Sequence, residues 1–246
     1  LPELSPRLGE FVRTNSEALL GIVEPERDAD FSKGVAITSI LHTDEHSHIE
    51  PVRYAEGSGF FRTMMLPHAP GATIASRLGG AARDILRNPK LWARAYTVPD
   101  MAKHSQVLLY MRTLDGSLTV RLGRHALNGF QRGLVTSLAP GTEPPQAFMP
   151  EATDLARRFA EQVGGVAVGL VSETLLGVPS TAHILGGASM GATHSEGVID
   201  PWHRVHGYDG MYVVDGSAVS ANPGVNPSLT ITALAERAMS AVPHAG

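Results

Sequence analysis

The pattern of apolar and polar positions predicts short strands and helices distributed along this 246-residue chain. β-Branched and apolar residues at 34–42 predict a strand. Weaker strand patterns at 48–54 and 59–65 flank a turn centred on Gly57. A short helical pattern lies around Leu8 to Val12.

The middle of the chain carries clearer periodic patterns. Residues 71–95 place Ala, Leu, Arg and Ile at helical spacing, with breaks expected at Gly79-Gly80 and near Asn88-Pro89. Asp115-Gly116 is the strongest short-range hairpin signal in the chain, because Asp-Gly suits a tight two-residue turn. The apolar runs that this turn would join are 106–112 and 118–122.

Two further helices and one strand are predicted towards the C-terminus. Residues 151–163 have an amphipathic pattern that ends at Gly164-Gly165. Residues 211–215 predict a short buried strand. The last helix is expected to start with Asn226 as its cap and Pro227 in its first turn.

These elements predict an α+β fold with a mostly antiparallel sheet. The β-rich middle, residues 31–178, is expected to be one domain, the substrate-binding domain. The segments 1–30 and 179–246 are short strand-loop-helix pieces, which usually belong to a different domain.

Composition narrows the function classes. The formal net charge is −4 with no basic cluster, so we expect no nucleic-acid partner. The chain has no cysteine, which excludes disulfides, thiolate metal sites and cysteine nucleophiles and leaves a cytoplasmic or a secreted bacterial location open. No apolar run approaches 18 residues, so we expect a soluble protein without a transmembrane segment. The chain starts at Leu1 without a signal-peptide pattern, which suggests a processed or split polypeptide.

The last 64 residues hold the best candidates for chemistry. His183 precedes Gly186-Gly187, and glycines allow the backbone to pass close to a flat ligand. A histidine there can act as a general base near neutral pH, although many histidines only bond a neighbouring carbonyl. Asn226 opens the terminal helix, whose N-terminal N–H groups attract negative charge. Asp215-Gly216 ends the predicted strand, a common ligand position in α/β proteins.

Other patterns leave alternatives open. Ser189 lies in a G-x-S-x-G sequence, the nucleophile elbow of serine hydrolases, but that motif requires a strand before it and a helix after it. Arg204 and His206 either contact a ligand or brace a turn. A ligand-rich stretch allows a metal site, although a solvated loop or a channel wall is the favoured interpretation because its side chains converge poorly. That stretch contains His42, Asp44, Glu45, His46, His48 and Glu50.

Taken in order, the C-terminal motifs resemble those of the FAD-dependent glucose-methanol-choline (GMC) oxidoreductases, particularly the cholesterol oxidase branch. The matches are H-x-L-G-G at 183–187, R-V-x-G at 204–207, Y-V-V-D-G-S at 212–217, G-V-N-P at 224–227 and T-A-L-A-E-R at 232–237. The first 180 residues fit this family more loosely, through L-P and T-N-S-E near the start.

The resemblance implies roles for seven residues. His183 resembles the active-site histidine that takes or shares the proton of the substrate hydroxyl. Asn226 resembles the asparagine that orients this hydroxyl and contacts the flavin edge. Asp215 and Gly216 resemble a cofactor-contacting pair, while Pro227 and Ser228 lie where the last helix would meet the flavin. Asn15 is a weaker match to an asparagine that lines the site.

The resemblance also implies a missing part. The G-x-G-x-x-G sequence that binds the FAD pyrophosphate is absent, since Gly57-Ser58-Gly59 is followed by Phe-Phe-Arg. We therefore expect a partner fragment or subunit that carries this motif and completes the FAD domain with 1–30 and 179–246. The assembled enzyme would oxidise a secondary alcohol, most plausibly a sterol 3-hydroxyl, with dioxygen or another acceptor reoxidising FAD. Double-bond isomerisation is doubtful, because neither Glu50 nor Glu56 lies in a convincing match. A sugar or terpenoid alcohol, or a non-catalytic subunit, remains an alternative.

Overall fold

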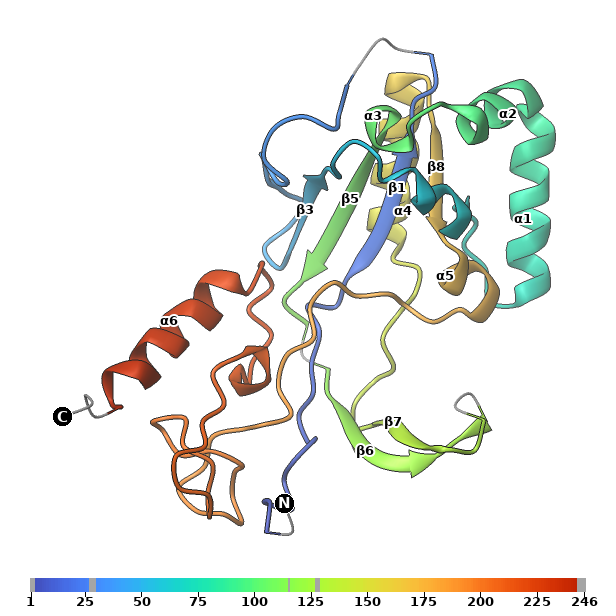
Figure 1. Ribbon diagram of the computed structural model, residues 1–246. Helices are drawn as coiled ribbons and strands as arrows, with labels where there is room; N and C mark the ends of the chain where they lie inside the picture. Colours follow the sequence, from blue (N-terminus) through green and yellow to red (C-terminus); the bar gives the residue numbers. More distant parts are fainter. Residues whose placement is uncertain (1–2, 27–29, 115, 127–128, 243–246) are drawn as a thin grey trace. The chain divides into compact units, whose positions relative to one another are not determined.

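The computed structural model describes residues 3–26, 30–114, 116–126 and 129–242 (Figure 1). The chain divides into two compact units. The sheet unit comprises residues 17–112 and 145–181, and the terminal unit comprises residues 1–16, 113–144 and 182–246.

These boundaries differ from the expected 1–30, 31–178 and 179–246. Residues 18–23 form a strand inside the main sheet, so the first boundary falls at residue 17 instead of 31. Residues 113–144, which were expected in the middle domain, belong to the terminal unit. The assignment of the two units to flavin and substrate binding stays a prediction.

The sheet unit is built on a six-stranded sheet in which every strand pair is antiparallel, as the expected α+β fold requires. The strand order is β2-β3-β5-β1-β8-β4, so β1 and β5 lie in the middle. The strands are β1 (Ala18–Val23), β2 (Leu41–His42), β3 (Ser47–Val52), β4 (Met65–Pro67), β5 (Ser105–Arg112) and β8 (Val166–Leu170).

Helices cover both faces of this sheet. The long helix α4 (Pro150–Val163) packs Ala152 and Ala156 against Leu20 and Tyr110, because alternate residues of a strand point to one face. On the opposite face, Trp92 of α2 (Pro89–Thr97) packs with Val23, Val166 and Val168. The remaining helices of this unit are η1 (Gly59–Met64), α1 (Ile74–Arg87), α3 (Met101–His104) and α5 (Val171–Leu176).

The terminal unit has little regular structure. It contains a two-stranded hairpin, β6 (Leu118–Arg124) with β7 (Arg132–Leu138), and long loops that hold the short helix η3 (Gly216–Ala218). The terminal helix α6 (Ser228–Ser240) follows those loops (Figure 1). A small core of Ala188, Val198, Ile199, Val205 and Ala218 holds the loops together.

Several predicted elements are confirmed. Strand 48–54 corresponds to β3, and helix 151–163 corresponds to α4, which ends at Gly164 in the left-handed conformation (φ 71°). The break near Asn88-Pro89 separates α1 from α2.

The hairpin predicted at Asp115-Gly116 is wrong. β5 pairs with β1 and β3, while β6 pairs with β7 in a separate sheet. Asp115 itself lies outside the described residues. The turn signal is local, whereas strand pairing depends on partners that are distant in sequence.

Other predicted elements are wrong or shorter than expected. Residues 8–12 are not helical: Leu8 and Gly9 lie in a turn, and Val12 makes a bridge with Leu118. Within 34–42 only Leu41–His42 is strand, and 59–65 is mainly the 3₁₀ helix η1. Residues 211–215 make a single bridge through Tyr212 to Arg204. The expected break at Gly79-Gly80 does not occur, since α1 continues through both residues.

Two negative findings concern the described ranges. None of the helices there is long and apolar enough to cross a membrane. In the same residues no three His, Asp or Glu side chains are grouped so that they could hold a metal ion. The stretch from His42 to Glu50 is a hairpin of β2 and β3 in which His42 pairs with His48.

Candidate active site

Three distant segments of the terminal unit meet at the H-I-L-G-G sequence. Arg13 and Leu185 exchange backbone hydrogen bonds of 2.6 and 2.9 Å. On the other side, the N–H of Gly186 donates to the carbonyl of Gly216, and the N–H of Ala188 donates to that of Ser217, both at 3.0 Å. The segment after His183 is therefore fixed between the N-terminal segment and the Asp215-Gly216 turn.

Glycine is required at the centre of this arrangement. Gly186 has a φ of +74°, and a Cβ atom there would lie 2.1 Å from the carbonyl oxygen of Phe11. Only a residue without a side chain can adopt this conformation so close to another backbone. The glycines after His183 thus hold the loop in place, and close approach to a ligand is not needed to explain them.

Asn15 connects His183 to the segment that precedes Asn226. Its side chain is fully buried. The amide nitrogen Nδ2 donates a hydrogen bond of 2.8 Å to the carbonyl of Val225 and lies 3.3 Å from Nδ1 of His183. The structure thus brings together Asn15, His183 and the backbone beside Asn226.

This geometry assigns the tautomer of His183. The carbonyl of Val225 can only accept, so the atom of Asn15 that faces it is the NH₂ group, a donor. The same NH₂ group faces Nδ1 of His183, which must then be the acceptor. In the neutral ring the proton therefore sits on Nε2, and His183 offers an N–H donor at that atom.

Asp215 and Gly216 stabilise the local backbone around η3. The side chain of Asp215 is exposed and accepts the N–H of Ser217 at 2.9 Å, which starts η3. A Cβ on Gly216 would lie 3.2 Å from the carbonyl oxygen of Ile184. Both residues lie beside the His183 segment, and their contact with a cofactor stays a prediction.

The start of α6 differs slightly from the expected cap. Pro227 occupies the cap position, Asn226 precedes it, and the helix begins at Ser228. The cap residue Pro227 makes no side-chain hydrogen bond to the helix. The N–H groups of its first turn, those of Ser228, Leu229 and Thr230, have no acceptor inside the helix.

The hydrolase interpretation of Ser189 is wrong. Ser189 is buried, and residues 192–196 form bends and turns where the elbow motif requires a helix. Arg204 and His206 brace loops, as favoured from the sequence. Arg204 Nε donates to Asp200 at 2.6 Å, and Nε2 of His206 lies 3.1 Å from the carbonyl oxygen of Gly191.

His203 is a residue that the sequence motifs did not single out. Its side chain is fully buried, its φ is +67°, and Nδ1 lies 2.8 Å from the carbonyl oxygen of Val213. A non-glycine residue in this conformation requires strong tertiary constraints. No local sequence pattern predicts this conformation of His203, since the neighbouring residues form an ordinary turn.

Comparisons with known proteins place these motifs in a family. The family model described as GMC oxidoreductase matches residues 104–235. Cholesterol oxidase of Mycobacterium tuberculosis is 41% identical over 252 residues, covering 100% of this chain and 43% of the relative. Cholesterol oxidase of Acinetobacter baumannii is 39% identical over 246 residues, covering 99% of this chain and 43% of the relative. Paromamine 6'-oxidase of Streptomyces fradiae is 33% identical over 125 residues, or 50% of this chain and 22% of the relative.

Two conclusions follow from these matches. The chain spans less than half the length of the cholesterol oxidases that it matches. GMC oxidoreductases are FAD-dependent flavoproteins. Since the family model covers more than half of the residues, this chain belongs to the GMC oxidoreductase family.

Proposed function

We propose that this chain forms the substrate-binding and catalytic part of an FAD-dependent enzyme that oxidises a secondary alcohol, with a sterol 3-hydroxyl as its substrate. The observation that carries this proposal is the contact of Asn15 with both His183 and the backbone beside Asn226. This contact lies between His183 and the backbone next to Asn226, the two residues that the family resemblance assigns to chemistry. Similarity to two cholesterol oxidases along the whole chain supports the choice of substrate.

The residues present fit a flavin. The first turn of α6 has N–H groups without an acceptor inside the helix, and such groups suit the carbonyl-bearing edge of the flavin ring. Asp215 directly precedes η3, and Ser228 is the first residue of α6. In this proposal their exposed side chains bind polar atoms of the cofactor. When bound, the flavin supplies the acceptor for the hydride that leaves the substrate carbon.

His183 binds the substrate oxygen in this proposal. With its proton on Nε2, the ring donates a hydrogen bond to that oxygen and stabilises the negative charge that develops on it as the hydroxyl proton passes to a water molecule and the hydride leaves the carbon. The general-base role expected from the sequence thus gives way to a donor role, and Asn226 orients the same oxygen.

The partner is a polypeptide that carries the dinucleotide-binding glycine motif. The chain has no such motif: Glu56 and Gly57 form a turn, and Gly59 starts η1. The cholesterol oxidases that it matches are more than twice as long as the aligned part, which leaves room for that motif. We propose that this region joins the terminal unit.

A reconstitution experiment tests the function. The chain is co-expressed with the N-terminal part of a cholesterol oxidase relative, and the purified complex is examined for flavin absorbance. A 3β-hydroxysteroid added without oxygen should bleach the flavin, whereas an aminoglycoside should not. Bleaching only by the aminoglycoside would favour a sugar-alcohol oxidase, which the partial similarity to paromamine 6'-oxidase brings forward as the second candidate.

A pair of variants locates the chemistry in the site. His183→Ala should retain the flavin and lower the bleaching rate by about 10² to 10⁴-fold, the range for one positioned proton-transfer or hydrogen-bonding group. His194→Ala is the matched control, because His194 is exposed and contacts the backbone of Glu3. An unchanged rate in His183→Ala, or equal losses in both variants, would remove His183 from the mechanism.

A further inference from the structure

Two segments of the chain run antiparallel at the candidate active site and contact each other at every second residue. The contacts, in order along the first segment, are Arg13 with Leu185, Asn15 with His183 and Glu17 with Thr181. The first is a backbone bridge, and the other two join side chains. In the last of them, the hydroxyl of Thr181 donates a hydrogen bond of 2.8 Å to Oε2 of Glu17. All three contacts follow one antiparallel register.

Side chains continue this register because the backbone ladder ends early. Ser16 has a φ of +49°, which lies outside the range of β-strands. Residues 14–17 and 181–184 accordingly form neither strand nor helix. Beyond the bridge at Arg13, the alignment of the two segments therefore depends on the side chains of Asn15 and Glu17.

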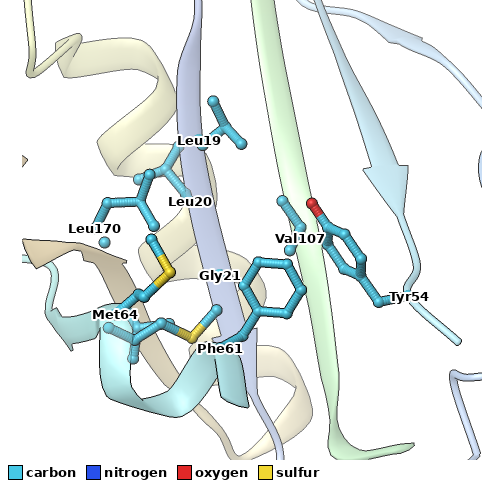
Figure 2. Close-up of a pocket in the computed structure, with 11 residues that line it drawn as sticks. Leu19, Leu20, Gly21, Tyr54, Phe61, Met64, Val107 and Leu170 are labelled. Atoms are coloured by element: carbon cyan, nitrogen blue, oxygen red, sulfur yellow. The ribbon is translucent and has the colours of Figure 1, made fainter. Parts of the chain in front are cut away.

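Glu17 is a firm point of attachment. It directly precedes β1, which pairs with both β5 and β8. Figure 2, a view of the apolar pocket over β1, shows Val107 of β5 on one side of this strand and Leu170 of β8 on the other. Glu17 is only 2% exposed. A buried carboxylate is costly unless it is hydrogen-bonded, so packing alone would favour an apolar residue here.

Thr181 is also fixed on the side away from His183. The N–H of the preceding residue, Ser180, donates to Oε1 of Glu173 at 3.3 Å. The hydroxyls of Ser180 and Ser172 lie 3.2 Å apart. The chain therefore reaches His183 from a point that is held by its neighbours, just as the glycines after His183 are held by theirs.

We infer that Glu17 is a positioning residue for His183. It holds Thr181 and thereby fixes the course of the chain two residues before the histidine. Without this hydrogen bond the segment would have more freedom, and Nδ1 of His183 would face Asn15 for less of the time. The importance of Glu17 for alcohol oxidation rests on the proposed function, whereas its effect on the tautomer of His183 does not.

Thr181→Val tests the effect on the tautomer in the full chain without flavin, because valine keeps the shape of threonine and lacks the hydroxyl. ¹⁵N NMR should show that the ratio of Nδ1-protonated to Nε2-protonated His183 rises about two- to tenfold, the range that the loss of one hydrogen bond permits. The signals of His203 should stay unchanged. Thr181→Ser keeps the hydroxyl and should give the parent spectrum.

Thr193→Val is the matched control. The hydroxyl of Thr193 donates to Glu196 at 3.1 Å, but both residues are exposed and only three positions apart. Loss of this threonine–glutamate hydrogen bond should leave the spectrum of His183 as it is in the parent chain.

A double variant shows whether Glu17 is the group through which Thr181 acts. Glu17→Met removes the acceptor and keeps the length of the side chain. Thr181→Val added to Glu17→Met should cause no further change in the His183 spectrum, because the hydrogen bond is already absent. If Glu17→Met fails to fold, the comparison of Thr181→Val with Thr181→Ser decides by itself.

The reconstituted complex tests the role in the reaction. Thr181→Val should lower the rate of flavin bleaching at saturating steroid by about 10- to 10²-fold, since small displacements of a reacting group have effects of this size. The steroid concentration that gives half the maximal rate should change less than about threefold. Thr181→Ser should recover the parent rate.

Several results would overturn the positioning role. They are an unchanged His183 spectrum in Thr181→Val, no recovery in Thr181→Ser, an equal change in Thr193→Val, and a full effect of Thr181→Val in the Glu17→Met background. An altered spectrum with a normal bleaching rate would remove Glu17 from the reaction. A parent complex that oxidises no alcohol would overturn the proposed function alone, because the NMR result does not depend on it.

Discussion

The side-chain nitrogen of Asn15 lies 3.3 Å from Nδ1 of His183, although 168 positions separate the two residues. The same nitrogen holds the carbonyl of Val225, next to Asn226. A single buried amide thus sets both the tautomer of the histidine and the position of the backbone beside the asparagine. The predictions below start from this contact and from other buried groups of the chain.

Asn15→Leu should release His183 from one tautomer. In the parent chain ¹⁵N NMR should find the proton of neutral His183 on Nε2, while His203, whose Nδ1 faces the carbonyl of Val213, should carry it on Nδ1. Asn15→Leu should raise the Nδ1-protonated population of His183 only. It should also lower the free energy of unfolding by about 1–3 kcal/mol, because the carbonyl of Val225 loses its donor. A proton on Nδ1 of His183 in the parent chain would contradict the assignment.

Gly186→Ala should destabilise the fold much more than Gly210→Ala. The two glycines have nearly equal φ angles, +74° and +75°, but only Gly186 would place a Cβ against another backbone, 2.1 Å from the carbonyl of Phe11. At Gly210 nothing lies within 4 Å. Gly210→Ala should cost about 1–2 kcal/mol through conformation alone, and Gly186→Ala clearly more. Urea unfolding measures both, and equal losses would show that the loop accommodates the extra atom.

Glu173 should make the chain less stable as the pH rises towards 7. Burial raises the pKa of its carboxyl from 4.5 to about 7, against the lowering effect of the N–H groups of Ser180 and Leu170. The folded state therefore holds a proton that the unfolded state loses above pH 4.5, so this contribution is complete below 4.5 and is lost between about 4.5 and 7. The loss is on the order of 3 kcal/mol. Urea unfolding of Glu173→Gln should lack this part of the pH dependence; parallel curves would contradict the prediction.

His68 should act in the opposite direction. Burial, with a smaller contribution from Arg157, lowers the pKa of its imidazole from 6.5 to about 4. Its contribution to stability is present above pH 6.5 and is lost as the pH falls through 6.5 towards 4, because the unfolded state binds the proton first. His68→Gln should flatten the acid side of the stability profile while leaving the Glu173 side unchanged. A variant with an unaltered acid side would show that His68 is not the responsible group.

Helices were easier to predict than strands, for a physical reason. The α4 pattern and its terminal glycine act within a few turns of chain, and the structure keeps both. Strand partners cannot be read in this way, since the Asp115-Gly116 turn signal and the apolar runs beside it gave no indication that β5 pairs with β1 and β6 with β7. Gly79 and Gly80 also lie inside α1, where tertiary packing outweighs their low helix propensity.

The sequence by itself determined the family, the order of the C-terminal motifs and the residues that carry them, because these depend only on residue identity and spacing. Tertiary structure alone decided which atoms meet, such as the amide of Asn15 with His183 and the Gly186 backbone with Phe11. Each of these contacts joins segments from distant parts of the chain. Such contacts form only when the whole chain packs, so no local pattern of residues specifies them.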